Sequence, residues 1–177
     1  MGGRSGGAGR RGRRLRPMAM FQRPGGGSGA SRMGTIASVE DGGGRAYRYL
    51  EIGSANNPTA IRGEGSISAW ESKAGYGGYK DPYLTVSVTR RLPEADRGKG
   101  IGMGMYLAGL KYAQDNNLGF RSDSSVSTAA RVVWNSLAAR GVEMTKSRRS
   151  ADFKFTISPE AVQNVDIDAL NRQRKTG

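Results

Sequence analysis

The sequence predicts an α+β domain preceded by a disordered-type arm rich in glycine and arginine. Short runs of alternating apolar and polar residues are typical of strands, and two longer segments have the apolar spacing of helices. Residues 1–33 contain ten glycines, eight arginines and no acidic residue. At 177 residues the chain has the length of one domain with tails. We divide it into the arm (1–33), the folded domain (34–160) and a basic C-terminal tail (161–177).

The arm carries most of the excess positive charge. Its eight arginines supply +8 of the formal net charge of +13, which leaves +5 for the rest. A segment with little hydrophobicity and one sign of charge is disordered in isolation and resembles Gly/Arg segments that bind nucleic acid. We therefore expect the arm to bind nucleic acid or neighbouring subunits of an oligomer or larger assembly, through Arg4, Arg10, Arg11, Arg13, Arg14 and Arg16. A solvated tail without a partner is the alternative.

Strand patterns begin after Arg45 and are bounded by glycine, asparagine and proline. In 83–88 three apolar residues alternate with Thr85 and Ser87, so one face of this strand is expected in the core. The strands predicted on this basis are 46–52, 61–71, 83–88, 120–122 and 153–157.

Two segments have helical patterns. The first, 101–116, is strongly apolar, and the turn residues 117–119 end it. The second, 128–140, is followed by Gly141, which suits the position after a helix. Its apolar residues share one face at i, i+3, i+4 and i+7, namely Ala130, Val133, Trp134 and Leu137.

The most informative local feature is a glycine turn between a predicted strand and a predicted helix. It has the sequence Arg97-Gly98-Lys99-Gly100-Ile101-Gly102. Glycines let the backbone approach a ligand, and the free N–H groups and dipole of a helix N-terminus favour a pyrophosphate. Arg97 and Lys99 can add charge-assisted hydrogen bonds. The turn therefore predicts anion binding, and the alternative is that its glycines only let helix and strand pack closely.

Spacing excludes two other phosphate-binding loops. A P-loop requires glycine where Pro93 stands, and serine or threonine where Gly100 follows Lys99. The dinucleotide fingerprint requires a third glycine where Met103 stands. The pattern that fits is RxxGxG, met by Arg97, Gly100 and Gly102.

The RxxGxG turn resembles the phosphate-binding motif of the GNAT superfamily of N-acetyltransferases, which also follows a valine-rich strand and precedes an apolar helix. A second stretch is similar to the fifth strand and next helix of GNAT domains, especially those of acetyltransferase-like proteins encoded by bacteriophages. Its matching residues are Ser122, Asp123, Ser127, Ala130, Trp134, Leu137 and Gly141. Together the matches span about a third of the chain, within 83–141.

The resemblance implies a mixed, mostly antiparallel twisted sheet flanked by helices, with 83–88 as the central strand. It implies acetyl-coenzyme A as the coenzyme, whose pantetheine arm would insert beside that strand, and an amine as the unidentified acceptor. It also implies a location in the cytoplasm of a bacterial host or within a virion. The binding residues expected are Val88, Thr89, Arg97, Gly98, Lys99, Gly100, Ile101 and Gly102.

Two features depart from the family pattern. The tyrosine that commonly protonates the leaving thiolate aligns with Trp134, whose indole cannot supply that proton. The two helices usually found between the first two strands have no room in residues 53–61. Glu64, Glu71 and Asp123 are candidate bases, with an ordinary solvated carboxylate as the alternative for each.

The absence of cysteine and histidine narrows the chemistry. It excludes disulfides, zinc sites and Cys-His or Ser-His-Asp groups, so we expect no metal. Apolar runs fall far short of the about 20 residues of a membrane span, so we expect no membrane contact. Two functions remain: an N-acetyltransferase of full, weak or lost activity, or a non-catalytic GNAT-fold structural protein of a phage virion, internal or associated with capsid or tail. A plain nucleic-acid-binding module would explain the arm but not the glycine turn.

Overall fold

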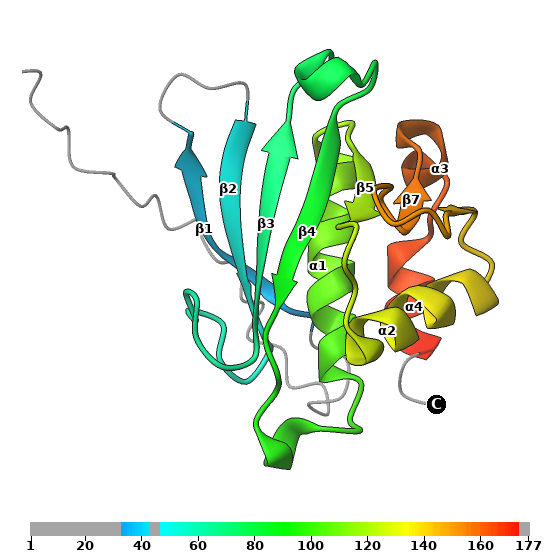
Figure 1. Ribbon diagram of the computed structural model, residues 1–177. Helices are drawn as coiled ribbons and strands as arrows, with labels where there is room; N and C mark the ends of the chain where they lie inside the picture. The colour runs from blue at the N-terminus through cyan, green and yellow to red at the C-terminus, as the bar shows by residue number, and fades with distance from the viewer. Residues whose placement is uncertain (1–32, 43–46, 174–177) are drawn as a thin grey trace, which may run out of the picture.

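The computed structural model describes residues 33–42 and 47–173, so the arginines proposed for the arm lie outside the described residues. The described chain forms one α+β unit (Figure 1). Its strands are β1 (Thr35–Asp41), β2 (Tyr47–Gly53), β3 (Ser66–Ser72), β4 (Tyr83–Thr89), β5 (Gly119–Ser122), β6 (Thr145–Lys146) and β7 (Phe155–Ile157). Its helices are α1 (Ile101–Asp115), α2 (Thr128–Ala139), α3 (Pro159–Gln163) and α4 (Ile167–Gln173), with single turns η2 (Tyr76–Gly78) and η3 (Glu94–Asp96).

The seven strands form one sheet in the order β1-β2-β3-β4-β5-β7-β6. All neighbouring pairs are antiparallel except β4 and β5, which are parallel because α1 connects them. The expected mixed, mostly antiparallel sheet is therefore confirmed. The pairing of β4 with β5 ends at Val86 and Ser122, although β4 continues to Thr89. Strand β5 itself ends at Ser122, so the last three residues of β4 have no β5 residue opposite them.

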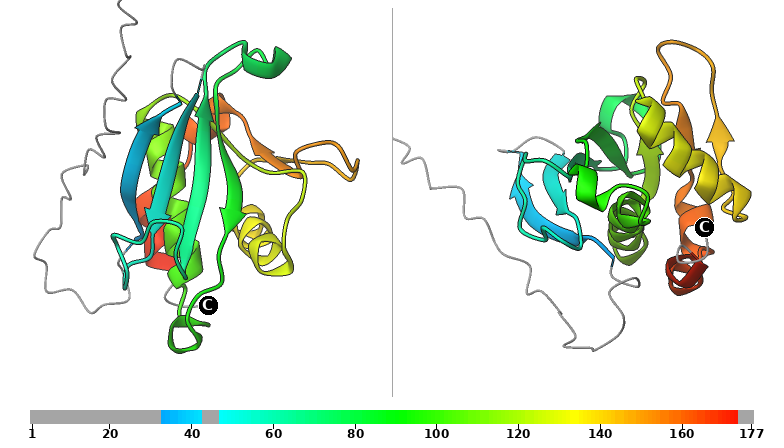
Figure 2. Two further views of the ribbon diagram at one scale, coloured as in Figure 1. Left: turned by 60° about the vertical axis from the view of Figure 1, so that its left-hand side comes forward. Right: turned by 90° about the horizontal axis from the view of Figure 1, so that it is seen from below.

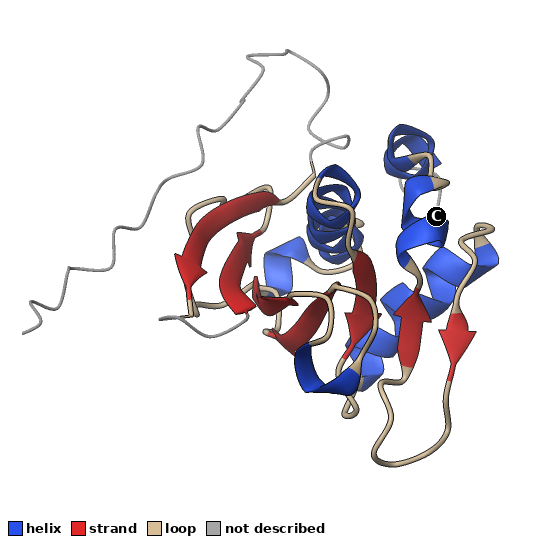
Figure 3. Cartoon of the chain, turned by 90° about the horizontal axis from the view of Figure 1, so that it is seen from above, coloured by secondary structure: helices blue, strands red, loops and turns tan. Residues whose placement is uncertain are grey.

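Helix α1 stands on one side of the strands (Figures 1 and 3). Eleven of its fifteen residues are buried, because it lies between the sheet and the helices α3 and α4. A Cβ added at Gly109 would lie 3.1 Å from the ring of Phe120 and 3.2 Å from Ile52. This glycine therefore allows the close approach of α1 to the sheet.

Helix α2 packs through Trp134, which is fully buried. The indole stacks on the ring of Phe155 at 5.6 Å and meets Tyr106 edge-on at 5.6 Å. The predicted apolar face is buried at Ala130, Trp134 and Leu137, while Val133 is half-buried. The hydroxyl of Ser127 accepts a hydrogen bond from the amide of Ala130 and caps the helix.

Three parts of the fold were not predicted, one of which is the short strand β6. The sequence pattern predicts no strand before residue 45, whereas 35–41 forms β1 at the edge of the sheet. The pattern also assigns 161–177 to a tail, whereas residues up to 173 form α3 and α4, with Val162 and Leu170 buried in the core. Both segments are short or divided between short elements, and contacts with β2 and α1 stabilise them.

The connection between β1 and β2 spans only residues 42–46. The first two strands of the sheet are therefore β1 and β2, and not the strands on either side of 53–61. Residues 54–65, which connect β2 and β3, contain no helix. None of the helices in the described ranges is long and apolar enough to cross a membrane.

Candidate functional site

A cavity of about 850 Å³ lies beside the glycine turn, between the β4–α1 connection and helix α2. Four arginines and no acidic residue are among its described lining residues: Arg90, Arg91, Arg97 and Arg140. Much of the remaining wall is apolar and includes Leu92, Met103, Met105, Val132 and Val133. This combination fits an elongated ligand that has both anionic and uncharged parts.

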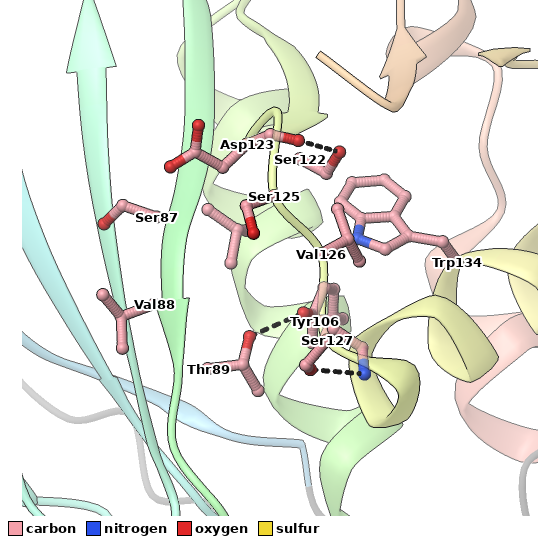
Figure 4. A pocket seen from close by; sticks show the side chains of 12 residues that line it. Ser87, Val88, Thr89, Tyr106, Ser122, Asp123, Ser125, Val126, Ser127 and Trp134 are labelled. Atoms are coloured by element: carbon pink, nitrogen blue, oxygen red, sulfur yellow. Dashed lines mark hydrogen bonds between the residues drawn. The ribbon is translucent and has the colours of Figure 1, made fainter. Parts of the chain in front are cut away.

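A second cavity, of about 310 Å³, lies between the C-terminal end of β4 and the chain that follows β5 (Figure 4). Thr89, Tyr106, Ser127 and Ala130 line both cavities. The two spaces therefore adjoin, and we call them together the groove. Its glycine end lies at the turn 97–102, and its gap end lies between the end of β4 and the chain after β5.

The glycine turn adopts a backbone that favours glycine at two positions. Gly98 and Gly100 have φ values of 74° and 73°, in the left-handed region. Gly100 is the N-cap of α1, and Gly102 lies in the first turn. All three line the larger cavity, so the N-terminal end of α1 faces the groove. This arrangement can bind an anion through backbone N–H groups.

The other predicted binding residues differ in position. Val88 and Thr89 line the gap end, and Val88 is 45% exposed. Arg97 lines the glycine end, and its Nε donates to the carbonyl of Leu92 at 3.1 Å. Lys99 is exposed and is absent from the described lining, and Ile101 is buried in the core at the start of α1.

Sequence reasoning missed two arginines after β4 and one at the end of α2. The guanidinium of Arg90 already has partners within the protein, because its Nη1 donates to the hydroxyl of Ser68 at 2.8 Å and lies 3.7 Å from the carboxylate of Glu51. Arg91 is exposed beside it. Arg140 Nη1 is buried and has no hydrogen-bond partner among the described residues. A buried guanidinium nitrogen without a partner indicates that a ligand or solvent satisfies it. The Arg90–Arg91 pair was the available sequence signal, whereas nothing in the sequence marked Arg140.

Two hydroxyl groups meet where the cavities join. The oxygens of Tyr106 and Thr89 lie 2.7 Å apart. Burial raises the pKa of Tyr106 to about 12, although its hydrogen bonds with Thr89 and with the indole of Trp134 act in the opposite direction. A buried hydroxyl group normally donates a hydrogen bond to a nearby acceptor. For the hydroxyl of Tyr106, the oxygen of Thr89 is within hydrogen-bonding distance. When Tyr106 donates in this way, the proton of Thr89 is free to point into the groove.

Of the three candidate bases, only Asp123 lines the groove. Its Oδ1 accepts from the amide of Ser124 at 2.7 Å, and Figure 4 shows its carboxylate directed towards β4, where Ser87 lies. Glu71 accepts a hydrogen bond from Tyr112 of α1 at 2.6 Å, outside the groove. Glu64 is exposed in the connection between β2 and β3. The geometry therefore separates Asp123 from the other two carboxylates.

Comparison with known proteins finds no matching family model, no matching curated protein and no matching solved structure.

Proposed function

We propose that this protein binds acetyl-coenzyme A in the groove and is a GNAT-like N-acetyltransferase that acetylates an amine. The observation that carries the proposal is the groove itself, with four arginines at the end that holds the glycine turn and the unpaired end of β4 at the other. Coenzyme A matches this division, since it has phosphates at one end and a long uncharged arm that leads to the thiol.

The residues present fit such a ligand. The amides of 98–102 and the guanidinium groups of Arg91, Arg97 and Arg140 would bind the phosphates. Beyond Val86, the backbone of β4 has no β5 residue opposite it. Its polar groups at 87–89 would therefore pair with the amides of the uncharged arm.

Acetyl-coenzyme A supplies the acetyl group when bound, and the chain supplies proton transfer. An amine with a pKa of about 10.4 must lose a proton before it can attack. Asp123, at the gap end, is the carboxylate placed to accept that proton, directly or through water. Trp134 cannot donate a proton to a leaving thiolate, but the hydroxyl of Thr89, oriented by Tyr106, can donate a hydrogen bond there.

Isothermal titration of the full chain with acetyl-coenzyme A tests the proposal. Gly100→Val should abolish binding, because a β-branched residue disfavours the positive φ and adds bulk at the ligand-facing turn. Gly141→Val is a matched control, since Gly141 has a φ of 93° but lies outside the lining of the groove. Both variants should lose about 1–2 kcal/mol of stability, and only the first should lose binding.

If the unmodified chain shows no affinity for coenzyme A or acetyl-coenzyme A, the proposed enzyme function is wrong. The fold would then serve the alternative function, that of a non-catalytic structural protein of a virion, with the arm docked on DNA or on neighbouring subunits.

A further inference from the structure

The hairpin of β6 and β7 is the most basic exposed part of the described chain outside the groove. Residues 145–154, here called the basic hairpin, contain Lys146, Arg148, Arg149 and Lys154 and a single acidic residue, Asp152. Its loop extends away from the body of the fold (Figure 2). Arg131 of α2 adds a fifth cation, because its guanidinium and Lys146 Nζ each lie 5.9 Å from the ring of Phe155.

Internal hydrogen bonds hold the basic hairpin in shape without neutralising it. The amide of Ser147 donates to the carbonyl of Lys154 at 2.9 Å, and the amide of Asp152 donates to the carbonyl of Arg149 at 3.2 Å. The carboxylate of Asp152 accepts from the hydroxyl of Ser147 at 2.8 Å. Among the described residues, no carboxylate forms an ion pair with any cation of the hairpin. Lys146, Arg148 and Arg149 are exposed, whereas Lys154 is half-buried and its ammonium donates to the carbonyl of Arg149.

An aromatic platform adjoins the base of the hairpin. The rings of Tyr79 and Phe153 lie 5.5 Å apart, and Tyr79 is 44% exposed. The buried guanidinium of Arg121 lies 3.7 Å from the centre of the Phe153 ring and 4.6 Å from that of Tyr79. Its Nε donates to Thr85 Oγ1 at 2.8 Å, so the cation that supports both rings is itself fixed on β4. The exposed ring of Tyr79 is thus presented on a rigid support.

We propose that the basic hairpin and Tyr79 together form a binding surface for single-stranded nucleic acid. Cations along a projecting hairpin suit a phosphate backbone, and an exposed aromatic ring beside them suits an unpaired base. Duplex DNA would satisfy the cations but not the ring, because its bases are stacked on one another. An acidic protein segment would satisfy the cations, but its carboxylates offer no planar ring to stack on Tyr79.

This surface goes beyond the proposed function and uses residues separate from the groove and from the arm. It nevertheless adjoins the gap end. The amide of Lys154 donates to the carbonyl of Asp123 at 3.3 Å, and the amide of Phe155 donates to the hydroxyl of Ser122 at 3.0 Å. A strand bound on the hairpin would therefore lie beside the site at which we place proton transfer.

Fluorescence anisotropy with a labelled oligothymidylate of about 16 nucleotides tests the proposal in the full chain. Charge reversal at Arg148→Glu and Arg149→Glu should weaken binding at least about tenfold and make the slope of log K against log salt shallower by about 1.4, since each contact with a single strand contributes about 0.7. The matched control is Lys111→Glu with Arg172→Glu, which changes the net charge equally on α1 and α4. Because the arm is present in both variants, its contribution cancels.

The contribution of the Tyr79 ring to binding is tested with separate variants. Tyr79→Ala should weaken binding about tenfold, whereas Tyr79→Phe keeps the ring and should bind as the unmodified chain does. Equal affinities of the hairpin and control variants would overturn the proposal. The proposal would also be overturned if a duplex of the same length, or polyglutamate of matched charge, bound as tightly as the oligothymidylate and Tyr79→Ala had no effect on binding. Binding of coenzyme A is measured separately, by titration of the hairpin variant. A failure of the proposed function would appear in that titration and would leave the anisotropy result unchanged.

Discussion

The two ends of the groove are built in different ways. The glycine end is local, since the consecutive residues 97–102 form the turn and open α1. The gap end is assembled from Thr89 of β4, Tyr106 of α1 and Asp123 after β5, which lie 34 residues apart at most. The glycine end can therefore be recognised from consecutive residues in the sequence. The gap end forms only when β4 and β5 pair in parallel.

The comparison also separates two roles. The arginines and backbone amides at the glycine end are suited to hold a ligand, and the hydroxyls and carboxylate at the gap end are suited to move protons. Substitutions at the gap end should therefore change turnover, and those at the glycine end should change affinity.

The largest effect on turnover is expected for Asp123→Asn. This change keeps the shape of the side chain but removes the proton acceptor, so kcat should fall at least about a hundredfold with the affinity for coenzyme unchanged. The measurement is acetyl transfer to a panel of primary amines, paired with titration of coenzyme A. Glu64→Gln, at an exposed carboxylate outside the groove, is the control and should leave both quantities unaltered. Full activity of Asp123→Asn would remove this residue from the mechanism.

A smaller effect should follow Thr89→Val. The variant removes the hydroxyl that Tyr106 orients, and about a tenfold loss of kcat is expected, the equivalent of one hydrogen bond. Thr89→Ser should restore the rate, because it returns the hydroxyl. Affinity for coenzyme should persist in both variants, since the backbone of β4 is retained. Equal rates for the valine and serine variants would show that the hydroxyl has no part in turnover.

Arg140→Gln should act on binding alone. Loss of a charge-assisted hydrogen bond costs about 1.5 kcal/mol or more, which corresponds to at least about tenfold weaker binding of coenzyme A. Arg131→Gln is the matched control on the same helix, because Arg131 is exposed and lies outside the described lining of the groove. Calorimetry gives both affinities. If the two variants bind alike, the buried nitrogen of Arg140 serves the packing around α2 and no ligand.

Much of the central fold could be predicted because its signals are local. Alternation in 83–88 and the apolar spacing of 101–116 predicted β4 and α1 within one residue at their ends. The buried face of α2 followed from the positions of Ala130, Trp134 and Leu137. In each case one short segment carries enough apolar side chains to show its own period.

The sequence by itself therefore determined the α+β class, the central strand and helices, and the glycine turn before α1. Only the tertiary structure decided that 35–41 pairs as an edge strand and that 161–173 packs on α1, because those segments gain stability from partners distant in the chain. It likewise brought Arg91, Arg97 and Arg140 to one cavity and placed Thr89 against Tyr106. Such juxtapositions depend on strand order and helix packing, which no local spacing records.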